Sequence, residues 1–146
     1  KALFAAHSSK FILEQLPGLP ITADFSHWCT VAESLLEDQE DATALACRQA
    51  IHLHARIGHE QGPQVNDPRS PEWEKHLKAH LQWWDAIIGH RQKMGADSMT
   101  VTPEFGPVPY MPSVPYSKQP LSDQWEINVY MMNLLKQRYQ HINSKK

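Results

Sequence analysis

Residues 51–58 read IHLHARIG, and this stretch decides the predicted fold. Apolar and polar side chains alternate along it, which is typical of a β-strand whose two faces meet different surroundings. Side chains two residues apart on a strand point to the same face, so His52, His54 and Arg56 are expected to lie together. The stretch therefore predicts a strand with one polar face.

This polar face needs a physical reason, because parallel strands are usually apolar on both faces. Ile51 and Leu53, which lie between the polar positions, are expected to pack beneath helices. A bound metal ion or anion would account for the polar residues. Histidines that are simply hydrogen-bonded in the core or at a sheet edge are the alternative, and both interpretations remain open at this point.

Helical and strand-like patterns alternate on either side of this stretch. Helices are predicted over residues 1–16, 30–47, 71–94 and 123–139, and strands over residues 19–24, 50–56 and 98–104. Ser70 and Pro71 form a typical helix start, and Gly95 is well placed to end the same helix. Regular alternation of this kind favours an α/β fold, with parallel strands covered by helices.

The composition of the chain is that of an ordinary folded domain, with 146 residues, 41% of them hydrophobic, and a formal net charge of -2. No apolar run approaches the roughly 20 residues of a membrane-spanning helix, and no cluster of Lys and Arg suits a phosphate backbone. Neither a membrane nor a nucleic acid is therefore expected as a partner. Cys29 and Cys47 lack the spacing of a zinc ribbon or a disulfide framework, which favours a cytoplasmic protein. The chain starts at Lys1 without a methionine, and we expect it to be a fragment.

Ionisable residues follow each of the three predicted strands. Asp24 and His27 come after the first strand, His54 and Arg56 end the second, and Glu104 ends the third. In parallel α/β folds, ligands bind at the carboxyl ends of the strands. Asp, His and Glu together form a mixed oxygen and nitrogen site that suits Mn²⁺, with Mg²⁺, Co²⁺ and Zn²⁺ as alternatives. The sequence thus predicts a metal site at this edge of the sheet.

Three motifs in these regions also resemble a known family. They are D-F-S-H-W at residues 24–28, H-L-H-A-R at 52–56 followed by G-P-Q-V-N-D-P at 62–68, and T-P-E-F-G-P at 102–107. Together they resemble the last strands of the xylose-isomerase-like sugar phosphate isomerases and epimerases, which are TIM barrels. The resemblance runs from about residue 10 to about residue 135. It implies that residues 1–146 are the C-terminal half of a (β/α)8 barrel, three to four strand–helix units, with the N-terminal half absent.

The resemblance also implies a metal-ligand set. In that family Glu, Asp, His and Glu at the ends of consecutive strands hold one divalent ion. Asp24, His54 and Glu104 match the last three of these, and the first glutamate would lie before Lys1. His52 remains an alternative to His54 as the ligand.

Roles in catalysis follow from the same resemblance. The family moves a proton next to a carbonyl of a sugar or sugar phosphate through an enediolate, whose charge a metal ion stabilises. Glu104 is expected to act as the catalytic base. His27 and Arg56 are expected to bind the substrate oxygens on which charge develops.

Other functions remain open for this sequence. The chain standing alone could be a non-catalytic half-barrel or a binding module. A lyase or dehydratase of cyclitols, or a hydrolase that cuts DNA at abasic sites, would use the same fold, although the acidic balance disfavours DNA. Three strands cannot close a barrel. A homo-oligomer, or association with the missing N-terminal half, is therefore expected.

Two further features carry open predictions. The proline-rich run at residues 103–120 is either a lid over a sugar or an ordered surface loop that contacts another subunit. The histidines at predicted helical positions, His76, His80, His90 and His141, are expected at the surface.

Overall fold

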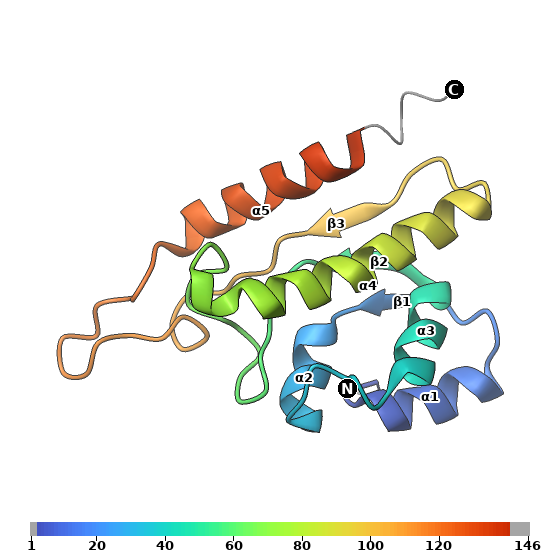
Figure 1. Cartoon of the computed structure of the whole chain (residues 1–146), viewed down its shortest axis with the longest axis horizontal. Helices are drawn as coiled ribbons and strands as arrows, with labels where there is room; N and C mark the ends of the chain where they lie inside the picture. Colours follow the sequence, from blue (N-terminus) through green and yellow to red (C-terminus); the bar gives the residue numbers. More distant parts are fainter. Residues whose placement is uncertain (1–2, 141–146) are drawn as a thin grey trace.

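The computed structural model describes residues 3–140 and is an α/β fold. Within these residues it contains a three-stranded parallel sheet and five α-helices (Figure 1). The elements follow in the order α1 (Ala6–Gln15), β1 (Ile21–Ala23), α2 (Phe25–Ala32), α3 (Glu40–Gln49), β2 (Ala50–His54), the 3-10 turn η1 (Pro71–Trp73), α4 (Glu74–Lys93), β3 (Thr100–Thr102) and α5 (Gln124–Tyr139). The α/β class and the parallel strands predicted from the sequence are confirmed.

The strands lie in the order β1-β2-β3, and β2 contains an irregularity that the sequence did not reveal. Ile21 pairs with Ala50, but the next residue of β1, Thr22, pairs with His52, so β2 has one residue more than its partner. The extra residue is Ile51, and its side chain is 47% exposed. A β-bulge leaves its additional residue outside the regular pairing. The prediction that Ile51 packs beneath the helices is therefore wrong, whereas Leu53 is fully buried as predicted.

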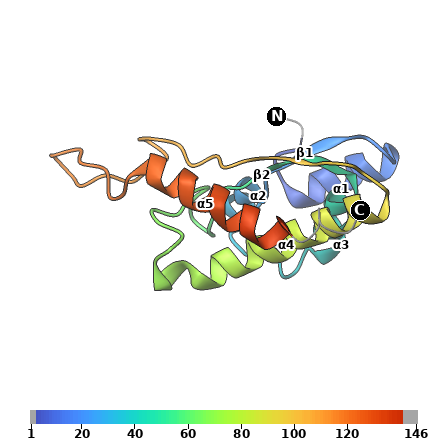
Figure 2. The ribbon, with the colours of Figure 1, turned by 90° about the horizontal axis from the view of Figure 1, so that it is seen from above.

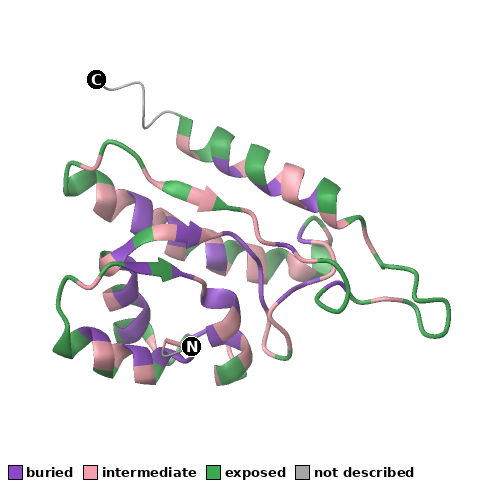
Figure 3. Cartoon of the chain, turned by 180° about the vertical axis from the view of Figure 1, so that it is seen from behind, coloured by how far each residue is buried: buried purple, intermediate pink, exposed green. Residues whose placement is uncertain are grey.

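Helices cover one face of the sheet only. α3 contacts β1 and α4 contacts β2, and Figure 2 shows both helices on the same side of the strands. The other face carries Thr22, His52, Thr100 and Thr102, none of which is buried. Viewed from that side in Figure 3, the strands lie in front of the helices. One polar face of the sheet is thus left uncovered by residues 3–140.

The single helix predicted over residues 30–47 is wrong, because two helices occupy this region. Asp24 caps α2 by accepting a hydrogen bond from the Ser26 amide at 3.1 Å, so this helix begins directly after β1. Glu33 and Leu36 then adopt left-handed backbone conformations. The turn buries Leu35 and Leu36, and α3 begins only at Glu40. Burial of two leucines in the turn replaces the continuous helix that the apolar spacing suggested.

Helix α4 ends as the sequence predicts, with Gly95 at a φ of +74°. Its histidines differ from the surface positions expected for them. His80 is fully buried, whereas His76 and His90 are partly buried. His141 lies outside the described residues.

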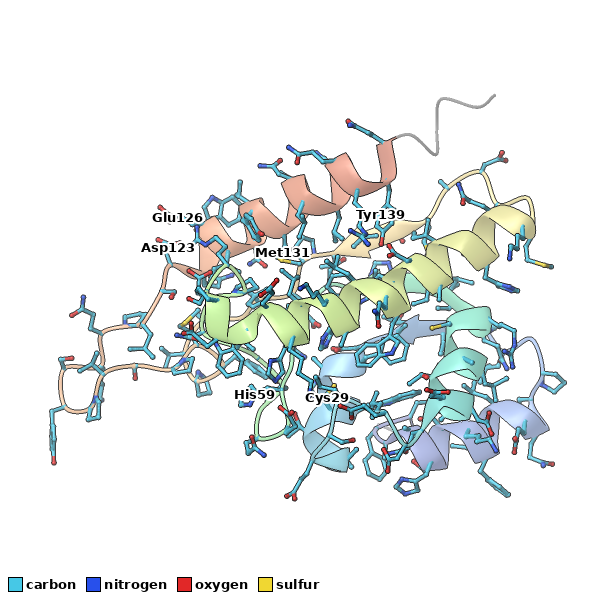
Figure 4. The ribbon with its side chains drawn as sticks, in the orientation of Figure 1. Cys29, His59, Asp123, Glu126, Met131 and Tyr139 are labelled. Carbon is cyan, nitrogen blue, oxygen red and sulfur yellow. The ribbon has the colours of Figure 1, made fainter. Side chains whose placement is uncertain are left out.

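Every fourth residue of helix α5 is buried. Ile127, Met131 and Leu135 form its buried stripe. Near its end, the Arg138 guanidinium and the Tyr139 hydroxyl both donate to the Asp85 carboxylate of α4, and Figure 4 shows Tyr139 on the side of α5 that faces α4. None of the helices within residues 3–140 combines the length and the apolar character that crossing a membrane would require.

Candidate metal centre

Side chains from three consecutive strand ends meet at the carboxyl edge of the sheet. Asp24 directly follows β1, His54 is the last residue of β2, and Glu104 lies two residues beyond β3. One ligand atom of each lies within 4.8 Å of the other two, so the three could hold a metal ion. Two ligands on opposite sides of an ion with bonds of about 2.1 Å are about 4.2 Å apart. Small side-chain rotations would therefore suffice, and the predicted convergence of these residues is confirmed.

The contact between His54 and Glu104 is short, and it is an ion pair when the ring is protonated. Nδ1 of His54 lies 2.7 Å from Oε2 of Glu104 and 3.6 Å from Oδ2 of Asp24. Oε2 of Glu104 is nevertheless buried and has no hydrogen-bond partner among residues 3–140, because the short contact lacks hydrogen-bonding geometry. Its charged neighbours are the His54 ring and Nη2 of Arg56, the latter at 3.8 Å. A divalent ion between the three residues of the cluster would neutralise its charge more fully.

The two carboxylates of the cluster have pKa values shifted in opposite directions. Burial alone would raise the pKa of Asp24, but the hydrogen bond from Ser26 and the charge of Arg56 together hold it below its ordinary value of 3.8. Burial raises the pKa of Glu104 above 4.5, and the attraction of Arg56 offsets this only in part. Glu104 is therefore the carboxylate of the pair that takes up a proton more readily.

His52 lies on the same face of β2 as His54 but outside this group. Its Nδ1 lies 2.6 Å from the Thr100 hydroxyl and its Nε2 lies 3.2 Å from the Thr102 hydroxyl. Both ring nitrogens therefore have partners on β3. The geometry favours His54 over His52 as the ligand, and metal binding itself stays a prediction.

Arg56 lies below the cluster, with only 3% of its side chain exposed. Its Nη2 donates to Oδ2 of Asp24 at 3.1 Å and its Nε donates to Oγ of Ser26 at 3.2 Å. The ring of Tyr110 covers the guanidinium at 4.9 Å. The structure thus surrounds Arg56 with protein groups, and its predicted contact with a substrate stays a prediction.

His27 extends from the first turn of α2 toward the same arginine. Its Nε2 lies 2.8 Å from Nη2 of Arg56 and 3.6 Å from Oδ2 of Asp24. Because a guanidinium only donates hydrogen bonds, Nε2 of His27 is the acceptor here, and the ring proton is assigned to Nδ1. The predicted role of His27 in binding substrate oxygens stays a prediction.

Neither a protein-family model, nor a curated protein, nor a solved structure matches this chain. The xylose-isomerase-like family stays a prediction from the motifs. The geometry of the cluster is the ground on which a function can be argued.

Ser26 and Tyr110 belong to this site. The sequence did not single out Ser26, and it offered Tyr110 only as an aromatic side chain of the lid, one of the two alternatives for residues 103–120. Oγ of Ser26 donates to Oδ1 of Asp24 at 2.5 Å while it accepts from Arg56. An Asp followed two residues later by Ser is a common local hydrogen-bonding pattern, and this was the signal available in the sequence. Tyr110 gave no such signal, because only the fold of the proline-rich segment brings it to Arg56.

Two side-chain amides hold the segment that follows Glu104. Gln64 donates to the Gly106 carbonyl at 3.0 Å and accepts from the Gly106 amide at 2.8 Å. Asn128 of α5 makes the same pair of bonds to Phe105, at 2.9 and 3.0 Å. These reciprocal bonds, here called the two amide clamps, fix the backbone directly after Glu104.

Beyond the clamps, residues 107–121 form an arm. Its base lies against the body of the molecule, where Met111 is buried, and its outer part projects away from the body (Figures 1 and 2). Its outer part is a small hairpin in which the Val114 amide donates to the Gln119 carbonyl at 2.8 Å. Tyr116 at the tip is fully exposed. The base of the arm thus touches the candidate site through Tyr110, and its tip points away. A lid and a subunit contact both remain open as roles for it.

Proposed function

We propose that this chain is part of a divalent-metal-dependent isomerase or epimerase of a sugar or sugar phosphate, with Asp24, His54 and Glu104 as metal ligands. The observation that carries the proposal is the convergence of these three residues within 4.8 Å at the carboxyl ends of three parallel strands. Ligand sites of parallel α/β folds lie at this edge. Mn²⁺ suits the mixed ligand set best, with Mg²⁺, Co²⁺ and Zn²⁺ as alternatives.

The proposed fold is the C-terminal half of a TIM barrel, in which β1, β2 and β3 are consecutive barrel strands. Two features support it. The helices lie on one side of the sheet, as on the outside of a barrel (Figure 2). The uncovered face carries the polar side chains Thr22, His52 and Thr100, which would face the interior of the barrel. The fourth ligand of the family pattern would then come from the other half.

The proposed chemistry is transfer of a proton from the carbon next to a carbonyl. A divalent ion, when bound, supplies positive charge that stabilises the negative charge of the enediolate. Glu104 is one of two acid–base groups in this scheme: its carboxylate accepts the proton from carbon, and for an epimerisation the glutamate expected from the other half returns a proton from the opposite face. The raised pKa of Glu104 agrees with this role but does not carry it. His27 would bind the substrate oxygens on which charge develops.

A second candidate is that the chain alone is a non-catalytic half-barrel. The observation that favours it is the uncovered polar face of the sheet, bearing Thr22, His52, Thr100 and Thr102. A barrel interior of this kind is complete only when further strands close it. In that case the chain binds its metal ion but needs the other half, or a second copy, for catalysis.

Deuterium wash-in separates the two candidates. The chain is loaded with Mn²⁺ in D₂O and incubated with a panel of ketoses and ketose phosphates, and exchange at the carbon next to the carbonyl is followed by NMR. The catalytic proposal expects exchange with at least one sugar, and loss of it in Glu104→Gln. Exchange that persists in Glu104→Gln removes this residue from the chemistry. Metal binding without exchange of any sugar supports the half-barrel.

A further inference from the structure

Arg56 is buried and carries a permanent charge, so its partners determine what it does. Its three closest contacts are Oδ2 of Asp24, Oγ of Ser26 and Nε2 of His27, at 3.1, 3.2 and 2.8 Å. Oε2 of Glu104 is farther away, at 3.8 Å. The guanidinium is therefore directed at Asp24 rather than at Glu104 or the open edge of the sheet.

Asp24 has nearly all of its acceptor positions occupied. A carboxylate offers about two acceptor positions on each oxygen. Oδ1 accepts from the amide and the hydroxyl of Ser26, at 3.1 and 2.5 Å. Oδ2 accepts from Arg56 at 3.1 Å and lies 3.6 Å from Nδ1 of His54. One acceptor position therefore remains, on Oδ2 and close to the other two members of the cluster.

Ser26, Asp24 and Arg56 are linked in a closed ring of hydrogen bonds. Its hydroxyl donates to Asp24 and accepts from Arg56, which itself donates to Asp24. The backbone of Ser26 is held as well, because Gly58 packs so closely that an added Cβ would lie 2.6 Å from the Ser26 Cα. Rotation of the Asp24 carboxylate would break bonds on both of its oxygens.

We propose that Arg56, acting with Ser26, is a positioning residue of the metal centre that restricts Asp24 to a single ligand oxygen, Oδ2. This inference rests on the proposed function, because it concerns the same metal centre. The bonds from Arg56 and Ser26 keep Oδ1 away from the ion and set the direction of Oδ2. Groups that orient a ligand in this way typically change metal affinity by about 10- to 100-fold when they are removed.

The test is a Co²⁺ titration of the full chain, read by calorimetry and by the visible absorption of the bound ion, which reports its ligand number and geometry. Arg56→Lys keeps the positive charge near the ion and removes only the planar fork that reaches Asp24 and Ser26 together. Ser26→Ala removes the hydroxyl and little volume. Arg69→Lys is the control, because Arg69 also bonds an aspartate, Asp67, through Nε and Nη2, and it lies outside the cluster.

We expect Arg56→Lys and Ser26→Ala each to weaken Co²⁺ binding by about 10- to 100-fold and to shift the absorption bands, since each removes one of the bonds that fix the orientation of the Asp24 carboxylate, while the Ser26 amide stays in place. Arg69→Lys should change neither. Circular dichroism checks the fold, and Ser26→Ala decides the question if Arg56→Lys does not fold. Wild-type affinity and bands in both variants, even with lower thermal stability, overturn the positioning role and leave the metal centre standing. A wild-type chain that binds no Co²⁺ overturns the metal centre and this inference with it.

Discussion

Nδ1 of His54 lies 2.7 Å from Oε2 of Glu104, yet the two atoms are not hydrogen-bonded. Two lone-pair atoms repel each other at this distance unless a proton or a cation lies between them. The third member of the cluster, Oδ2 of Asp24, lies 3.6 Å from the same nitrogen. The fold therefore brings these atoms into an arrangement that a bound cation would relieve.

Replacing His54 should abolish metal binding, whereas replacing His52 should not. His54→Ala removes one of three ligands, and its cost in Mn²⁺ affinity should exceed the roughly 100-fold upper effect of an orienting group. His52→Ala is the matched control, because His52 lies on the same face of β2 and bonds Thr100 and Thr102 instead. Calorimetry measures both affinities. Equal loss in the two variants would contradict the assignment of His54.

A bound ion should also stabilise the fold. Because the ligands come from three strand ends, the unfolded chain cannot present them together, and Mn²⁺ should raise the unfolding temperature with its concentration. Chelation with EDTA should reverse the rise. Glu104→Gln should show a much smaller rise. An unfolding temperature that is independent of Mn²⁺ in the wild type counts against the centre.

Stability should fall on the acid side of neutrality because of His80. Burial lowers the pKa of His80 from 6.5 to about 4, and the fold fixes its neutral form, since Nε2 accepts from the Gly58 amide while Nδ1 lies 2.9 Å from the His76 carbonyl. Between these two pH values the unfolded state binds the proton and the folded state does not, so stability is lost as the pH falls from 6.5 toward 4. Over this whole range the free energy of unfolding falls by about 3 kcal/mol.

Urea unfolding at several pH values measures this effect. His80→Gln removes the titrating group, so it should be less stable than the wild type at pH 8 but should lose less free energy on acidification. If both proteins lose the same amount of free energy between pH 7 and pH 4.5, burial of a neutral His80 is not the cause.

Two glycines should respond to alanine in opposite ways. At Gly58 an added Cβ would lie 2.6 Å from backbone atoms of Ser26, and Gly58→Ala should cost about 1–3 kcal/mol through overpacking. At Gly89, inside α4, nothing lies within 4 Å of the added Cβ. Gly89→Ala should therefore stabilise the protein by about 1 kcal/mol through helix propensity. Thermal unfolding measures both, and destabilisation by Gly89→Ala would contradict the packing around α4.

The uncovered face of the sheet should drive association. Thr22 and Thr100 lie exposed on it, and β3 has a free edge toward the side away from β2. We expect a dimer or larger assembly in sedimentation. Thr100→Lys should weaken this assembly, and Gln82→Lys, at an exposed position of α4, should not. A protein that stays monomeric at high concentration would show that neither the uncovered face of the sheet nor the edge of β3 drives association.

The sequence predicted the meeting of Asp24, His54 and Glu104 because strand ends in a parallel sheet share one edge, whatever the detailed register. It did not predict the exposure of Ile51, since a period of two along a strand contains no sign of an inserted residue. The contacts of Arg56 with Asp24 and Ser26 were not predicted, for a related reason. Alternation places a side chain only while the strand lasts, and β2 ends at His54.

Two other misses share a different physical cause. His80 was expected at the surface because histidine is polar, but backbone groups on both sides of its ring satisfy it and make burial of the neutral form tolerable. The break between α2 and α3 escaped because the apolar spacing of residues 30–47 suits a helix. Leu35 and Leu36 are instead buried from a turn, and tertiary packing overrides local propensity there.

The two amide clamps affect which segments of the protein can change in sequence during evolution. Gln64 and Asn128 grip the backbone of Gly106 and Phe105, not their side chains, and both lie outside the arm. The clamps separate Glu104 from the outer hairpin of the arm, residues 113–120. This hairpin can therefore change in length or sequence during evolution with little effect on the position of the Glu104 carboxylate, whereas Tyr110, which covers Arg56, and the buried Met111 cannot.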